Sequence, residues 1–131
     1  MKKLTIPLLF TAFVVLSSFS VSERVEGVTP QEPLFEYDPD VMAIIENKCL
    51  GCHSPEGRSD KAKKALQWEK LPNMTKAEVI AGFEEVLEVL EEGSMPPSRL
   101  LEKYPDKALT KKETKAMSKW FDAKADELLG E

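Results

Sequence analysis

The sequence predicts a small all-α domain. Thr75 to Glu78 and Thr110 to Glu113 both have the Thr-x-x-Glu spacing of a capping box, in which each side chain satisfies a backbone N–H group of the first helical turn. Apolar residues recur at helical spacing after each box. No segment shows the alternation of apolar and polar residues that is typical of a strand.

The N-terminal segment has the pattern of a secretory signal peptide. Lys2 and Lys3 precede an apolar stretch from Leu4 to Phe19, and small serine residues follow it. The stretch is shorter than the roughly 20 residues that span a membrane, which favours cleavage over retention as an anchor. We therefore expect residues 1–22 to be removed on export to the periplasm, with no stable membrane span in the mature protein.

The rest of the chain suits one domain with a short leader. Residues 23–37 contain Pro30 and Pro33, and each proline disfavours helical geometry in the residue before it. This segment is expected to be extended, and residues 38–131 are expected to form the domain. No internal repeat or low-complexity tract is present.

The first helix of the domain is expected to begin at Asp38 or Asp40, either of which can act as its N-cap. Its apolar residues lie at helical spacing, and it ends by delivering Cys49. A loop over residues 54–59 follows, and Ser59 or Asp60 can begin a short helix that ends near Leu66.

The two capping boxes open the longer helices. The helix after Thr75 has an apolar stripe and can end at Gly93, and its other face is rich in glutamate. The helix after Thr110 is the last. We expect the stripe to consist of Val79, Ile80, Phe83, Val86, Leu87 and Leu90. On or near the inner side of the last helix we expect Ala116, Met117, Trp120, Phe121 and Leu128.

The run Cys49-Leu50-Gly51-Cys52-His53 is the attachment sequence of covalently bound haem. Two thiols at this spacing can each form a thioether to a vinyl group of haem, and the adjacent histidine can bind the iron. We expect the carbonyls of residues 54–59 to accept the Nδ1 proton of His53, which leaves Nε2 for the iron. One covalent haem c is the predicted cofactor, and the helix after Thr75 is expected to wall its pocket.

Other uses of the motif fit the sequence less well. A structural zinc site needs four ligands, and the chain has two cysteines and one histidine in all. A redox-active cysteine pair of the thioredoxin type is expected in a βαβ context, whereas the surroundings here are helical. A non-haem exported binding protein, with a metal or a disulfide at Cys49 and Cys52, is an interpretation that stays open beside a haem protein.

The sixth iron ligand is predicted to be Met95. It lies 42 residues after His53, where Pro96 and Pro97 restrict the backbone and can hold a thioether in place. Met74 is the competing candidate, because it also lies in a loop. The remaining methionines of the domain, Met42 and Met117, lie on expected helices and are expected to pack in the core.

The haem motif, the later Ser94-Met95-Pro96-Pro97 and the flanking helices together resemble the class I cytochrome c family, in particular small exported bacterial domains with one haem. The resemblance covers about residues 38–129. It implies a cytochrome c-like fold whose first and last helices cross, with the first helix packed on Trp120 and Phe121. It also implies that Cys49 and Cys52 bind haem, with His53 and Met95 as its axial ligands.

The predicted function is that of a periplasmic electron carrier, and no enzymatic activity is expected. A peroxidase needs a distal acid–base group, and the single histidine is already used on the proximal side. The alternative is a haem-based sensor or gas-binding module, whose sixth iron position would be open or labile.

Charge limits the partners. Removal of residues 1–22 takes away two lysines, which leaves 16 basic against 23 acidic side chains and a formal charge of −7. This acidity argues against nucleic acid and permits docking to redox partner proteins with a basic surface.

Overall fold

The computed structural model describes residues 32–130, and all regular elements in this range are helices. The α-helices are α1 (Pro39–Lys48), α2 (Leu50–His53), α3 (Asp60–Ala65), α4 (Lys76–Glu92), α5 (Ser98–Leu101) and α6 (Lys111–Leu129). Two short 3-10 helices, η1 (Leu71–Asn73) and η2 (Pro105–Lys107), lie between them. The all-α prediction is therefore confirmed. The expected signal peptide, residues 1–22, lies outside the described residues.

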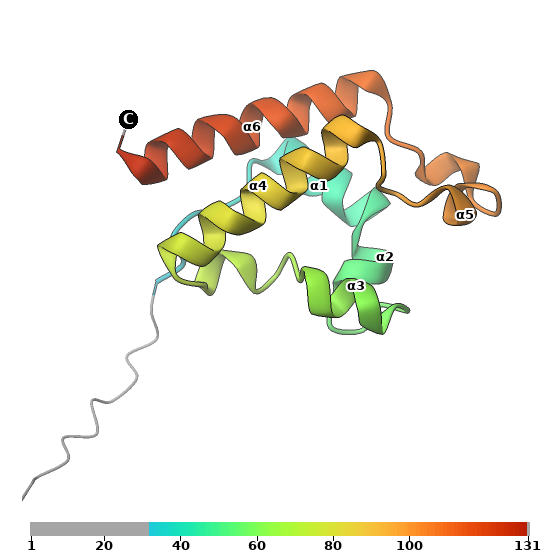
Figure 1. The fold of residues 1–131 in the computed structure, drawn as a ribbon, viewed down its shortest axis with the longest axis horizontal. Coiled ribbons are helices and arrows are strands. Elements are labelled where there is room, and N and C mark those ends of the chain that lie inside the picture. The colour runs from blue at the N-terminus through green and yellow to red at the C-terminus, as the bar shows by residue number, and fades with distance from the viewer. Residues whose placement is uncertain (1–31, 131) are drawn as a thin grey trace, which may run out of the picture.

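Two long helices form the body of the domain. Figure 1 shows α4 and α6 beside each other, and α1 contacts α6. The short helices α2 and α3 lie together below α1 and α4 in this view, and α5 lies apart from the bundle next to η2. None of the described helices is long and apolar enough to cross a membrane.

Local signals begin and end the helices as predicted. Both capping boxes form, since the Thr75 and Thr110 hydroxyls accept from the N–H groups of Glu78 and Glu113, whose carboxylates accept from the threonine N–H groups in return. These bonds lower the pKa of both glutamates. Gly93 ends α4 with a φ of 63°, a left-handed conformation that only glycine adopts without strain.

The first and third helices also begin at predicted residues. The Asp38 carboxylate accepts from the N–H groups of Asp40 and Val41 at the start of α1. Asp38 rather than Asp40 is thus the N-cap. Ser59 caps α3 by accepting from Ala62 N at 3.2 Å. Each cap satisfies backbone donors that the first turn of a helix cannot pair internally.

Aromatic rings fill the core between α4 and α6. The rings of Phe83 and Phe121 are both fully buried, and their centroids lie 5.0 Å apart in an edge-to-face arrangement. Trp120 packs against both rings. Met117 is also buried, whereas Ala116 is exposed. Ala116, expected on or near the inner side, lies outside the buried face of α6, because that face is centred on Met117 and Phe121.

The described part of the expected leader, residues 32–37, contains no helix or strand but packs onto the domain. Phe35 is buried and contacts Phe83 edge to face, with ring centroids 5.2 Å apart. The Tyr37 hydroxyl donates to Trp68 O at 2.9 Å, and its burial raises the pKa of Tyr37 well above the usual range. The core of the domain thus includes residues before Asp38.

Replacement of Phe83 by alanine tests the aromatic core. Phe83→Ala is expected to lower the free energy of unfolding by about 3–5 kcal/mol, because it removes a fully buried ring and leaves a cavity. Chemical denaturation measures the change. Leu129→Ala is the control, because Leu129 is 53% exposed. Similar small losses in the two variants would contradict this account of the core.

Candidate functional site

Cys49, Cys52 and His53, the three residues of the predicted motif, lie on one helical turn. Cys49 closes α1 by donating its N–H to Ile45 O at 2.8 Å, and α2 starts at the next residue. The N–H groups of Cys52 and His53 both donate to Cys49 O, at 3.1 and 3.0 Å. The two thiols and the imidazole therefore have their relative positions set by local backbone hydrogen bonds.

Both cysteines are free thiols and are partly buried. Burial raises the pKa of Cys49 to about 12; Cys52 adds to the rise, and the Lys48 ammonium opposes it. Cys49 is thus a neutral thiol at pH 7. The attacking cysteine of a redox-active pair has a lowered pKa instead, so this environment disfavours such a role for Cys49.

A carbonyl distant from the motif orients the His53 ring. His53 Nδ1 lies 3.1 Å from Leu66 O, and a carbonyl oxygen can only accept, so Nδ1 carries the proton. This tautomer leaves Nε2 with a free lone pair for a metal. The expectation that a carbonyl within residues 54–59 accepts this proton is wrong. That loop turns back on the motif, where Arg58 N donates to Gly51 O at 3.1 Å.

The segment after α3 is tied to the motif a second time. Trp68 N donates to His53 O at 3.3 Å, so the backbone of residues 66–68 is bonded to both the ring and the carbonyl of His53. The Trp68 side chain is buried and stacks at a tilt on Phe121, with ring centroids 5.9 Å apart. The histidine is thereby connected to the aromatic core.

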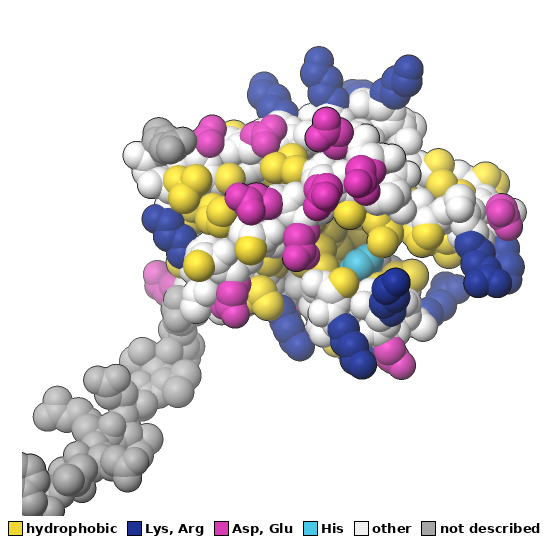
Figure 2. All heavy atoms as spheres, viewed as in Figure 1, with side chains coloured by type: hydrophobic (Ala, Val, Ile, Leu, Met, Phe, Trp, Pro, Cys, Tyr) yellow, Lys and Arg dark blue, Asp and Glu magenta, His cyan; other side chains and the backbone are white. Residues whose placement is uncertain are grey.

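A cavity of about 380 Å³ opens beside the motif, and its lining is mostly apolar. Figure 2 shows a hollow in this face of the molecule, and the histidine side chain is visible inside it. The lining includes all four predicted site residues, Cys49, Cys52, His53 and Met95. Gly82, Glu85, Val86, Val89 and Leu90 of α4 form one wall. The expectation that this helix walls the site is confirmed for the cavity.

The methionines differ in their positions around the cavity. Met95 lines it together with Pro96 and Pro97, although its side chain is 41% exposed. Met74 is 36% exposed and is not among the lining residues. Met42 packs against the core, and Met117 is buried in it, as expected, but Met117 also contributes to the cavity lining.

A buried donor in the cavity lining has no partner. Trp68 Nε1 is fully buried and makes no hydrogen bond with any residue of the range 32–130, and Trp68 lines the cavity. A buried N–H without an acceptor is unfavourable, so a ligand with an acceptor group near this atom would relieve the cost. Haem, which has an apolar ring and peripheral carboxylates, fits such a cavity, because the thiols, a free imidazole nitrogen and a thioether line the same space.

Simple metal binding by acidic and thiolate side chains has less support. Within residues 32–130, no group of three or more histidine, cysteine, aspartate and glutamate side chains could hold a metal ion. Comparison with known proteins adds no assignment, since no family model, no curated protein and no solved structure matches the chain.

Sequence reasoning missed two parts of the site. No sequence signal identifies Leu66 as the acceptor for His53, because any residue supplies the same carbonyl. Gly57 also escaped notice. A Cβ on Gly57 would collide with the backbone of Cys52 and Ser54, so only glycine allows the loop to lie against the motif. The available signal was the glycine four residues after the histidine, because a glycine in a loop can indicate a close approach between backbone segments.

Replacement of Gly57 by alanine tests this close approach. Gly57→Ala is expected to lower the free energy of unfolding by about 1–3 kcal/mol, because backbone rather than a flexible side chain must move. Gly51→Ala is the matched control, since a Cβ at Gly51 meets nothing within 4 Å. Thermal or chemical unfolding of both variants gives the comparison. Equal stabilities would show that the loop accommodates a side chain freely.

Proposed function

We propose that this protein is a periplasmic c-type cytochrome with one covalently bound haem, which carries single electrons between redox partners. The observation that carries the proposal is the orientation of His53, with Nδ1 bonded to Leu66 O and Nε2 free, in an apolar cavity that Cys49, Cys52 and Met95 also line. The proposal includes a cytochrome c-like fold, which the contact between α1 and α6 supports.

Each residue has a separate task in this proposal. Cys49 and Cys52 hold the haem through thioether bonds, and His53 Nε2 binds its iron. When bound, haem supplies an iron that alternates between the ferric and ferrous states. Leu66 O fixes the imidazole ring, and the apolar wall of α4 limits access of water. Trp68, whose buried Nε1 has no partner among the described residues, would be a donor for a carboxylate of the haem.

Met95 is the proposed distal ligand. It lines the cavity, whereas Met74 does not. A thioether ligand raises the reduction potential relative to a second histidine, because it favours the ferrous state. No acid–base group is needed for electron transfer, and Glu85 is the only carboxylate among the lining residues. The site thus suits an electron carrier better than a peroxidase.

The exposure of Met95 favours one alternative function. Its side chain is 41% exposed, and its neighbours Ser94 and Pro97 are exposed as well. A weakly held sixth ligand can be displaced by a small gas molecule. A haem-based sensor or gas-binding module is therefore the second candidate, and carbon monoxide binding to the reduced protein distinguishes it from a carrier.

Surface charge supports protein partners with a basic docking surface. Figure 2 shows acidic side chains gathered beside the hollow, and Glu84, Glu85, Glu88, Glu91 and Glu92 on α4 make no ion pair with any described residue. Such a field speeds the approach of a positively charged partner. With the predicted signal peptide, it supports a soluble redox partner in the periplasm and argues against nucleic acid.

Absorption spectra of the exported protein test the proposal directly. After expression with a cytochrome c maturation system, we expect an α band of c-type haem in the reduced state and a weak sulfur-to-iron band in the oxidised state. Cys49→Ala and Cys52→Ala are each expected to remove one covalent link, which mass spectrometry and pyridine haemochrome spectra detect. A mature protein without covalent haem would refute the proposal.

Met95→Ala tests the distal ligand. We expect loss of the sulfur-to-iron band, a change from low-spin to high-spin iron and binding of carbon monoxide to the reduced protein. Met74→Ala is the control and should keep the wild-type spectrum, because Met74 lies outside the cavity lining. The opposite pair of results would transfer the role to Met74.

A further inference from the structure

The segment that carries Met95 is weakly attached to the rest of the domain. Residues 94–109, here called the distal segment, include α5 and η2, which pack closely against each other. No residue of the distal segment is buried. Figure 1 shows α5 apart from the bundle. Leu109 packs against the core at the end of the segment, but the rest of it has few buried contacts, and such segments open first. Polar contacts to other elements are therefore important for holding it in place.

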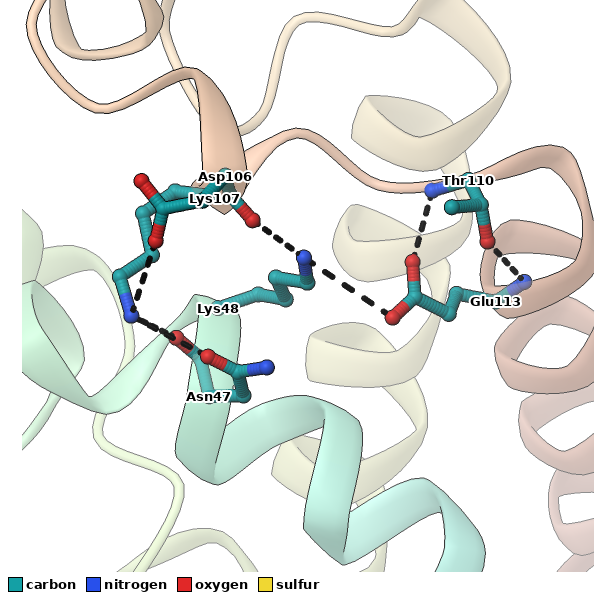
Figure 3. A network of polar contacts seen from close by, with 6 residues as sticks. All are labelled: Asn47, Lys48, Asp106, Lys107, Thr110 and Glu113. Carbon is teal, nitrogen blue, oxygen red and sulfur yellow. Dashed lines mark hydrogen bonds and ion pairs between the residues drawn. The ribbon is translucent and has the colours of Figure 1, made fainter.

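Two lysines provide polar links between the distal segment and α1 (Figure 3). Lys107 Nζ, in η2, donates to Asn47 O at 2.7 Å and to Asn47 Oδ1 at 3.1 Å. In the reverse direction, Lys48 Nζ donates to Asp106 O. Beyond Ser94, these are the only hydrogen bonds among the described residues that join the distal segment to other elements.

The end of α1 is a favourable place for these cations. The last carbonyls of a helix lack partners within it, and the helix dipole places partial negative charge there. Lys107 supplies a donor and a positive charge to one of these carbonyls. Lys48, whose side chain is only 9% exposed, also lies 3.9 Å from Glu113 of α6. The contacts therefore join α1, η2 and α6 immediately before Cys49.

We propose that Lys107, together with Lys48, is a positioning residue that keeps the distal segment, and with it Met95, against the cavity. The inference rests on the proposed function, because it concerns the sixth ligand of the haem. Lys107 lies twelve residues after Met95 and is not one of the residues that line the cavity. Its effect on the iron is therefore indirect and operates through the population of the closed segment.

Loss of one link shifts a closed–open equilibrium of the distal segment. Carbon monoxide can reach the iron only when Met95 has left it, so its rate of binding measures the open population. Hydrogen bonds from charged groups are stronger than neutral ones, and their removal should raise a minor open population about five- to tenfold. None of the fully buried core residues belongs to this segment, so the loss of the link should change the stability of the core little.

Lys107→Met tests the inference in the full haem protein. The binding rate of carbon monoxide to the ferrous form is expected to rise about five- to tenfold, and the sulfur-to-iron band is expected to weaken. Lys103→Met is the matched control, since Lys103 lies in the same segment and makes no ion pair with a described residue. Lys107→Arg retains a cationic donor and should behave as wild type.

Amide hydrogen exchange gives a readout that does not depend on the haem. In the distal segment, Glu102 N donates to Ser98 O at 3.0 Å and Tyr104 N donates to Leu100 O at 2.9 Å. Exchange at these amides should be faster in Lys107→Met than in Lys103→Met, with exchange in the core of α4 and α6 unchanged. The same exchange and the same carbon monoxide rate in both variants would overturn the inference.

The failure of this inference can be separated from failure of the proposed function. A wild-type protein with haem and a sulfur-to-iron band, but with no effect of Lys107→Met, would refute the positioning role alone. A wild-type protein without covalent haem would refute the proposed function. In that case, amide hydrogen exchange still tests the link between Lys107 and α1. Unchanged exchange in the distal segment of Lys107→Met would refute this link, and faster exchange would support it.

Discussion

The hydrogen bond between His53 Nδ1 and Leu66 O is the interaction on which the candidate site depends. It fixes the ring, the tautomer and the availability of Nε2 at once. It also requires residues 66–68 to lie next to the motif, where Trp68 N donates to His53 O. Trp68 then joins the aromatic core through Phe121 and Tyr37. The histidine is therefore oriented by the same packing that stabilises the domain.

The two sides of the domain differ in how they are filled. Between α4 and α6, aromatic rings pack edge to face with full burial. Beside the motif, the same two helices line a cavity, so their apolar side chains there lack contacts that a packed core would provide. The buried, unpartnered Trp68 Nε1 adds a polar cost in this region. Both features are consistent with a domain whose core is completed by a ligand such as haem.

The proximal and distal sides of the site are held by different forces. The proximal residues are fixed by backbone hydrogen bonds within one helical turn and by the close approach of Gly57. Met95 lies in a segment without buried residues, which charged hydrogen bonds from Lys107 and Lys48 connect to α1. In the proposed cytochrome, a firmly held histidine and a more loosely held methionine would leave the strength of the sixth ligand open to adjustment by surface residues.

The sequence alone determined α1, α3, α4 and α6 and the composition of the motif, because these depend on residues a few positions apart, whereas it did not reveal α2, α5, η1 or η2. The capping boxes, the end of α4 at Gly93 and the common turn of Cys49, Cys52 and His53 follow from local hydrogen bonds. Only the tertiary structure decided which carbonyl orients His53, that Met95 rather than Met74 lines the cavity and that Ala116 is exposed. These features depend on the path of the chain between elements and on the rotation of each helix against its neighbours, and backbone carbonyls carry no sequence signal that could reveal them.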